Sequence, residues 1–233
     1  MTAQAVALGV VLSGVTGELV RVEVDIADGL PGVVVVGLPD ASVSESRQRI
    51  KVAIERMGRT WPTRRVTIGL SPAELRKHGS GLDLPMAVAV LAASDQLRGA
   101  DLTSTAFVGE VGLDGRLLAP RGVLAAAVAA RRAGLARVVV PVAGAEQLHR
   151  LTGIAVAACV DLASVADVVT GVQVESGSEP AASSRPDPWA GPDLRDVRGH
   201  AQARLGLEVA AAGGHHIALV GPPGVGKTLL ADR

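Results

Sequence analysis

The sequence is poor in the residues that most often mark a specialised chemistry. Its 233 residues include a single cysteine, Cys159, which excludes an internal disulfide framework and a cysteine-based zinc site. Tyrosine is absent, and with only Trp61, Phe107 and Trp189 as aromatic residues, platforms for stacking nucleic-acid bases are scarce. Lys and Arg number 23, as do Asp and Glu, so the chain as a whole is not an electrostatic ligand for nucleic acid.

Long apolar runs are absent as well. No stretch approaches the roughly 18 apolar residues that a membrane helix needs, and the opening "MTAQAVALGVVLSGV" lacks the basic region of a signal peptide. We therefore expect a cytoplasmic protein that makes no membrane contact. Hydrophobic residues nevertheless make up 48% of the chain, which is ample for a folded core.

The first part of the chain, residues 1–171, has the pattern of one continuous globular domain. Apolar and charged residues alternate over 20–26, which predicts a half-buried strand, and "GVVVVGL" at 32–38 predicts a buried one. Further strands are predicted at 64–70 and 137–142. Because an Asp114-Gly115 hairpin interrupts the alternation of strands and helices, the predicted fold class is α/β (mixed α+β) rather than a purely doubly wound sheet.

Three helices are predicted between these strands. The first opens at a capping box formed by Ser42 and Glu45 and ends at Gly58. The second starts with Asp83 as its N-cap. The third is rich in alanine and stops at Gly134.

The composition changes after this domain. Residues 172–192 are rich in Ser, Pro, Gly and Asp and have no periodicity, so they are predicted to be a linker. Residues 193–233 then begin a second domain. It has an amphipathic helix ending at Gly213-Gly214, a strand at 217–220 and a glycine-rich loop.

That loop, "GPPGVGKT" at 221–228, matches the phosphate-binding P-loop pattern in full. Glycines allow successive backbone N–H groups to turn toward phosphate oxygens, and the helix that follows adds the positive end of its dipole. Lys227 is expected to reach the β- and γ-phosphates and the Thr228 hydroxyl to bind Mg²⁺. The predicted cofactors are ATP and Mg²⁺, with Thr228 as the metal ligand; the predicted binding residues are Gly221, Pro222, Pro223, Gly224, Val225, Gly226, Lys227, Thr228 and Leu229.

Binding alone does not make a P-loop protein an ATPase. Hydrolysis needs an acidic residue at the end of another strand to hold Mg²⁺, together with groups that orient water. Asp40 follows "VVVV", but Gly-Leu-Pro intervenes, and a turn or helix-cap role explains it more simply. We therefore predict no catalytic residue within these 233 residues.

Four segments carry a more specific resemblance: "VVVVGLPDASVSESRQRIKVAIERMG", "RKHGSGLDLPMAVAVLAAS", "AFVGEVGLDGRLLAPRGVLAAAVAARRAG" and "DVRGHAQARLGLEVAAAGGHHIALVGPPGVGKT". Together they resemble the magnesium-chelatase-like AAA+ ATPases of the ComM/YifB group, in the right order and over almost the whole chain. The resemblance implies a Lon-protease-like domain over 1–171 and an incomplete P-loop AAA+ domain over 193–233. The chain is thus expected to be an amino-terminal fragment.

The resemblance also implies a function. Members are expected to be ATP-driven ring motors, and therefore homo-oligomers, that act on DNA as helicases or in branch migration during transformation and recombination. ATPase activity is expected of the full-length protein and not of residues 1–233. The alternatives are a Lon-like serine peptidase and a magnesium chelatase subunit.

The peptidase alternative can be tested residue by residue. Laid on the pattern of Lon-type proteases, Gly81 takes the place of the nucleophilic serine, and Leu124 takes the place of the catalytic lysine. Because leucine cannot accept a proton, this dyad is missing. Ser80 with Lys77 is the remaining candidate pair, although Lys77 is more simply interpreted as a solvated charge.

Positive charge is concentrated in one segment, residues 41–80. It holds three Glu residues against nine basic ones, which are Arg47, Arg49, Lys51, Arg56, Arg59, Arg64, Arg65, Arg76 and Lys77. A solvated helix face is the common meaning of such a segment. The sharper hypothesis is a surface that contacts the phosphates of DNA.

Overall fold

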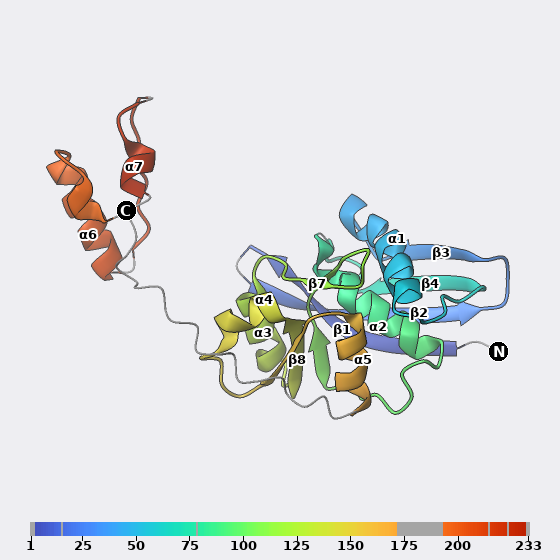
Figure 1. Ribbon diagram of the computed structural model, residues 1–233. Helices are drawn as coiled ribbons and strands as arrows, with labels where there is room; N and C mark the ends of the chain where they lie inside the picture. Colours follow the sequence, from blue (N-terminus) through green and yellow to red (C-terminus); the bar gives the residue numbers. More distant parts are fainter. Residues whose placement is uncertain are drawn as a thin grey trace. The chain divides into compact units, whose positions relative to one another are not determined.

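The computed structural model describes residues 3–14, 16–77, 79–171, 193–213, 215–222 and 224–231, so the predicted linker and Pro223 lie outside the described residues. The chain divides into two compact units, Met1–Glu175 and Ser176–Arg233 (Figure 1). The identification of the parts as a Lon-like domain, a linker and the start of a motor stays a prediction.

The first unit is built on one mixed seven-stranded sheet, in the order β3-β4-β2-β1-β5-β8-β9. β1 pairs antiparallel with β2, and β2 with β4, whereas the other neighbouring strands run parallel. This arrangement confirms the mixed α/β class. The strands are β1 (Ala3–Ser13), β2 (Thr16–Ala27), β3 (Gly32–Val36), β4 (Arg65–Ser71), β5 (Thr105–Phe107), β8 (Arg137–Pro141) and β9 (Ala155–Cys159).

Two hydrophobic clusters lie on opposite faces of this sheet. Successive strand residues point to opposite faces, and Ala106 belongs to one cluster while Phe107 belongs to the other. The helices on the Phe107 face are α1 (Ala41–Arg56), α2 (Asp83–Ala93) and α5 (Leu162–Thr170). On the Ala106 face lies α3 (Val123–Arg132), and the short α4 (Val142–Ala145) follows β8 (Figure 1).

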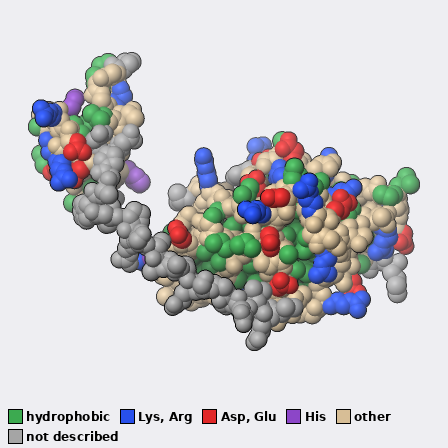
Figure 2. Space-filling model, in the orientation of Figure 1, with side chains coloured by type: hydrophobic (Ala, Val, Ile, Leu, Met, Phe, Trp, Pro, Cys, Tyr) green, Lys and Arg blue, Asp and Glu red, His purple; other side chains and the backbone are tan. Residues whose placement is uncertain are grey.

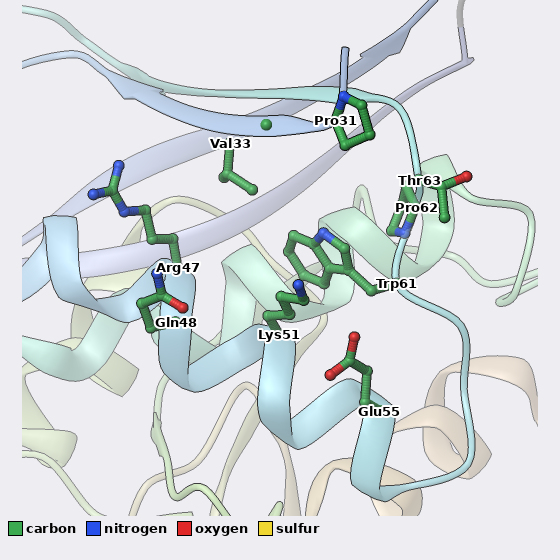
Figure 3. Close-up of a pocket in the computed structure, with 10 residues that line it drawn as sticks. Pro31, Val33, Arg47, Gln48, Lys51, Glu55, Trp61, Pro62 and Thr63 are labelled. Carbon is green, nitrogen blue, oxygen red and sulfur yellow. The ribbon is translucent and has the colours of Figure 1, made fainter. Parts of the chain in front are cut away.

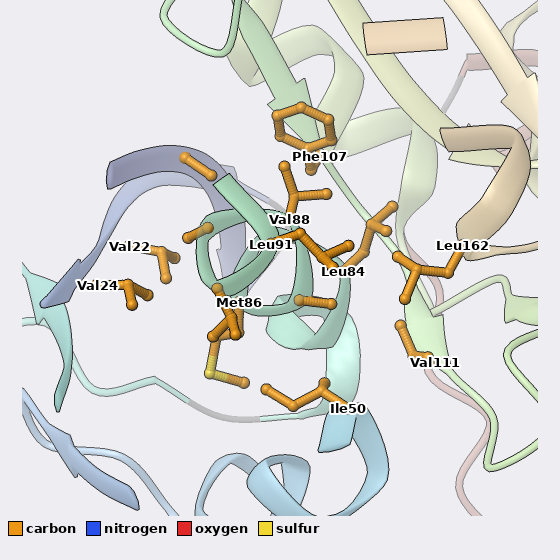
Figure 4. Packing of buried hydrophobic residues seen from close by; sticks show 14 of the residues in the cluster. Val22, Val24, Ile50, Leu84, Met86, Val88, Leu91, Phe107, Val111 and Leu162 are labelled. Atoms are coloured by element: carbon orange, nitrogen blue, oxygen red, sulfur yellow. The ribbon is translucent and has the colours of Figure 1, made fainter. Parts of the chain in front are cut away.

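Helix α2 forms the centre of the larger cluster. Ten of its 11 residues are buried, because its sequence "DLPMAVAVLAA" is apolar all round and therefore suits an interior position. Figure 4 shows side chains from β2, α1, β5 and α5 around it, and Met86 and Phe107 are completely buried. This packing holds the start of α2, where Ser80, Gly81 and Asp83 lie.

Two helix starts differ from the sequence prediction. The N-cap of α1 is Asp40, whose carboxylate accepts a hydrogen bond from Val43 N at 2.8 Å, so the predicted capping box at Ser42 and Glu45 is wrong. The interpretation of Asp40 as a helix cap is confirmed. Asp83 is not an N-cap either, because a short 3-10 helix (Ser80–Leu82) leads directly into α2 and places Asp83 inside the first turn.

The strand predicted as buried at 32–38 is an edge strand instead. β3 pairs with β4 on one side, and no strand within the described part of the chain pairs with its other side. Val34 and Val36 are 41% and 47% exposed. An apolar run has the same sequence at the centre or at the edge of a sheet, so composition alone could not distinguish these positions.

Several turn predictions are confirmed. Asp114-Gly115 lies in the hairpin between β6 (Glu110–Val111) and β7 (Leu117–Leu118), with Gly115 at a φ of 84°. The alanine-rich helix α3 ends just before Gly134, whose φ is 78°. Both glycines adopt the left-handed conformation that other residues avoid.

The second unit is described over 193–213, 215–222 and 224–231. It contains a 3-10 turn (Leu194–Asp196), α6 (Ala201–Gly213) and α7 (Lys227–Ala231). The strand predicted at 217–220 is not formed, which corrects the sequence prediction. A parallel strand of this kind needs hydrogen-bonded neighbours, and the described residues of this unit contain no strand. None of the helices in the described ranges is long and apolar enough to cross a membrane.

Candidate functional site

The predicted phosphate loop closes on itself around a lysine. The ammonium group of Lys227 donates hydrogen bonds to the carbonyl oxygens of Gly221 and Pro222, both at 2.8 Å. Gly224 and Gly226 have φ values of 82°, so the loop turns at its two inner glycines. Lys227 is also the first residue of α7, so one residue joins the start of the loop to the helix that follows.

The other predicted binding residues lie in the same short segment. Thr228 is exposed one residue into α7, and Val225 is exposed in the loop. The amide of Leu230 donates to Gly226 O at 3.0 Å, which makes the glycine the start of the helical hydrogen-bonding pattern. These residues converge through local geometry alone, and their role in binding stays a prediction.

His200 is a neighbour of this loop that the sequence interpretation missed. A Cβ placed on Gly226 would lie 3.9 Å from His200 Nε2, so the imidazole lies beside the turn. His200 has a φ of 52°, which is uncommon for a residue other than glycine. No local sequence pattern indicates this contact, because His200 and Gly226 are 26 residues apart in the chain.

A buried ion pair joins α1 to α2 in the first unit. The carboxylate of Asp83 is inaccessible to solvent and accepts hydrogen bonds from Arg49 Nε at 2.9 Å, from Val111 N at 3.3 Å and from the Ser46 hydroxyl. Burial raises the pKa of Asp83, and the hydrogen bonds from Arg49, Ser46 and Val111 oppose that increase. This carboxylate therefore holds two helices and the β6 strand together.

The positions that would carry a Lon-type dyad hold no such pair. Gly81 lies in the 3-10 turn, and Leu124 is 44% exposed on the first turn of α3. The Ser80 hydroxyl donates to the Glu110 carboxylate instead of to an amine. Ser80, Gly81 and Glu110 line a cavity of about 440 Å³ that is otherwise mostly apolar.

Lys77, the other member of the remaining candidate pair, is fully buried rather than solvated, which corrects the sequence interpretation. Its ammonium group donates to the Pro72 carbonyl oxygen, and its backbone bonds to Leu38 and Asp40. Desolvation lowers the pKa of Lys77, while Glu74 opposes this effect. Ser80 and Lys77 are thus each hydrogen-bonded to a different group.

The basic segment 41–80 is not one uniform surface. Arg49 is engaged by Asp83, Lys77 is buried, and Arg64 forms an ion pair with Asp28 at 3.4 Å. Arg47, Lys51, Arg56, Arg59, Arg65 and Arg76 are exposed. On the face shown in Figure 2, Lys and Arg side chains are interspersed with Asp and Glu, so the positive charge there is not gathered into a single patch.

A groove that sequence reasoning missed lies between α1 and β3. Its volume is about 360 Å³, and its lining comes from the start of β3, one side of α1 and the loop that carries Trp61 (Figure 3). Trp61 is 8% exposed, so its indole forms part of the wall. The α1 residues in the lining include Arg47, Lys51 and Glu55, whose four-residue spacing was the available signal.

Comparison with known protein families gives two matches for this chain. Residues 22–144, more than half of the chain, match the family described as subunit ChlI of Mg-chelatase, and residues 193–233 match the family described as magnesium chelatase, subunit ChlI. The two matches fall on the sheet-containing unit and on the phosphate loop. They define the class as magnesium-chelatase-like.

Individual relatives narrow this class. The chain is 45% identical over 227 residues to the uncharacterized protein Rv2897c of Mycobacterium tuberculosis, covering 97% of this chain and 45% of the relative. It is 40% identical to YifB of Salmonella typhimurium over 220 residues (94% and 43%) and 34% identical to competence protein ComM of Haemophilus influenzae over 223 residues (94% and 44%). The chain belongs to the ComM/YifB family of magnesium-chelatase-like proteins. It spans less than half the length of these relatives.

Proposed function

We propose that this chain carries the nucleotide-binding start of an ATP-driven AAA+ motor that processes DNA. The observation that carries the proposal is the P-loop, in which Lys227 lies against the opening carbonyl groups and two glycines turn the backbone. Membership of the ComM/YifB family supports the use of nucleotide and Mg²⁺ in general terms. The matched families are described as magnesium chelatase subunits, but no side-chain arrangement in the described residues specifically supports chelation, and Gly81 and Leu124 occupy the positions of a Lon-type dyad.

The loop residues fit a bound triphosphate. A cation already lies over the loop, and Gly224 and Gly226 adopt the positive φ values that let backbone N–H groups face an anion. Lys227 would exchange its carbonyl contacts for phosphate oxygens, and Thr228 would hold Mg²⁺, which neutralises the developing charge during phosphoryl transfer. The hydrolytic acid is expected outside this loop.

DNA is the proposed substrate of the complete motor. One relative is named competence protein ComM, which fits a role in DNA transformation. In this chain, Arg56, Arg59, Arg65 and Arg76 are the exposed cations of segment 41–80 that lie outside the α1–β3 groove. We propose that this segment contacts phosphates. We also propose that the protein acts in the cytoplasm as a homo-oligomer, in keeping with a ring motor.

The first experiment measures nucleotide chemistry in the complete gene product. We expect ATP binding and DNA-stimulated ATP hydrolysis, and Lys227→Ala should abolish both. The control variant Arg198→Ala removes an exposed cation outside the loop and should leave ATP binding and hydrolysis unchanged. Residues 1–233 alone should bind ATP weakly and hydrolyse none. Wild-type ATPase activity in Lys227→Ala would refute the proposed role of the loop.

The second experiment addresses DNA. Replacing Arg56, Arg59, Arg65 and Arg76 together with Ala should weaken binding of a DNA duplex and flatten the dependence of affinity on salt concentration, because fewer counterions are released. Fluorescence anisotropy at several salt concentrations measures both effects. An unchanged salt slope would mean that the segment is only a solvated surface.

A further inference from the structure

The groove between α1 and β3 has the shape of a site for an extended chain. Its volume of about 360 Å³ lies within the range usual for ligand sites. One wall is the edge strand β3, and the opposite wall is the side of α1 that carries Arg47, Lys51 and Glu55 (Figure 3). Val33 and Trp61 supply the apolar surface between these walls.

The edge of β3 supplies hydrogen-bonding groups to such a chain. β3 is the last strand in the sheet order, and it pairs in parallel with β4 only, within the part of the chain that the structure describes. An unpaired strand edge is a template for an added strand. The alternate side chains of an added strand would reach the groove, and the others would lie beside Val34 and Val36, which are 41% and 47% exposed on the opposite face of β3.

The charges along α1 select the chemistry of that added strand. Arg47 and Lys51 are one helical turn apart, about 6 Å along the axis, and residues i and i+2 of a strand are about 6.6 Å apart. Figure 3 shows Arg47, Lys51 and Glu55 following one another along α1 opposite β3. Two acidic side chains at alternate positions of an extended peptide therefore match the two cations in spacing and in charge.

We propose that the α1–β3 groove binds an extended acidic peptide, which adds to the free edge of β3 and places alternate carboxylates on Arg47 and Lys51. Its intervening side chains are apolar and cover Val34 and Val36. Strand addition between an edge strand and a helix provides affinity through the backbone and specificity through alternate side chains. DNA phosphates fit less well, because the indole of Trp61 is buried in the wall and offers no open face for a base.

The test uses a fluorescein-labelled peptide, Gly-Ser-Val-Glu-Val-Glu-Val-Ser-Gly, and the whole chain. We expect saturable binding by fluorescence anisotropy and hydrogen-exchange protection at 32–36. The double variant Arg47→Glu with Lys51→Glu should weaken binding at least tenfold. The matched control, Arg56→Glu with Arg59→Glu, reverses two exposed charges outside the groove and should change the affinity less than twofold.

Two further peptides test the charge pairing and the strand addition separately. A peptide with Lys in place of both Glu residues should bind the double variant better than the wild type, which also shows that the variant is folded. A peptide methylated on alternate backbone nitrogens should bind at least tenfold more weakly, and equal binding would overturn strand addition.

The remaining outcomes concern other occupants. Absence of peptide binding overturns the proposal. The proposal is also overturned if the double variant weakens binding of a single-stranded oligonucleotide but leaves the affinity for the peptide unchanged. The proposal does not depend on nucleotide binding, which is measured separately through Lys227→Ala. Failure of one therefore leaves the other standing.

Discussion

The two units differ in how far each buries its own apolar residues. The first unit has hydrophobic clusters on both faces of its sheet. Among the described residues of the second unit, only Val197, Ala210 and Leu230 are buried, and Leu205 and Val209 on α6 are 61% and 59% exposed. The P-loop motif is therefore complete in sequence and makes its own internal contacts, although the described residues around it bury few apolar side chains.

The sharpest test of this difference is a pair of matched truncations. Phe107→Ala removes a fully buried ring from the first unit and should lower its free energy of unfolding by about 4 kcal/mol. Leu205→Ala removes an exposed side chain from α6 and should change stability by less than about 0.5 kcal/mol. Urea unfolding followed by circular dichroism measures both. Similar losses in the two variants would contradict the contrast between the units.

A second prediction concerns the ion pair that joins α1 to α2. Asp83→Ala leaves the half-buried guanidinium of Arg49 without its partner and should cost about 3 kcal/mol in the same unfolding measurement. Arg98→Ala removes an exposed ion pair with Asp95 and should cost at most about 1 kcal/mol. If Asp83→Ala were as mild as the control, the network would contribute little to the first unit.

The single cysteine provides a reporter for the first unit alone. Burial raises the pKa of Cys159 to about 11, so its reactive thiolate is scarce at pH 8 in the folded state, whereas an unfolded cysteine has a pKa of about 8.5. We expect iodoacetamide to alkylate the folded chain at least about a hundredfold more slowly than the urea-unfolded chain. Lys227→Ala, in the second unit, should not alter the folded rate. Rapid alkylation of the native chain would show that β9 opens readily.

The smallest expected effect is the pH dependence caused by Lys77. Because desolvation lowers the pKa of Lys77 in the folded state, the unfolded chain binds more protons between that lowered value and the ordinary pKa of about 10.4. Stability should therefore rise with pH across this window, by less than about 1.4 kcal/mol per pH unit. Lys77→Met should abolish the rise. A wild-type slope that Lys77→Met retains would assign it to another group.

The features that could be predicted from the sequence are those decided by neighbouring residues. Alternation over 20–26 gave a half-buried strand because period 2 is a property of the strand itself. Asp114-Gly115 and Gly134 gave a hairpin and a helix end because their backbone conformations are local. The contacts that Lys227 makes within the loop are also local, since they span at most six residues, whereas the role of the loop in binding nucleotide stays a prediction.

The features that could not be predicted depend on distant partners. Asp83 meets Arg49 across 34 residues, which no local pattern signals, so it was placed at a helix cap instead. Lys77 lies beside Leu38 and Asp40, which bond to its backbone from 39 and 37 residues earlier in the chain, so its burial depends on the tertiary fold. The groove at Trp61 likewise requires β3 to lie at the edge of the sheet.

The strand order has a consequence for the chain as it leaves the ribosome. β1, 11 residues long, pairs with β2 at once through a short turn, but its other edge waits for β5, where Leu8 meets Ala106 and Gly9 meets Phe107. Until translation passes that point, the nascent sheet has a long open edge at its future centre, a template for pairing with another nascent chain. We expect a polypeptide that ends at residue 100 to aggregate and one that ends at residue 171 to stay soluble, and sedimentation measures both. Equal solubility would mean that the unpaired edge of β1 is protected before β5 is made.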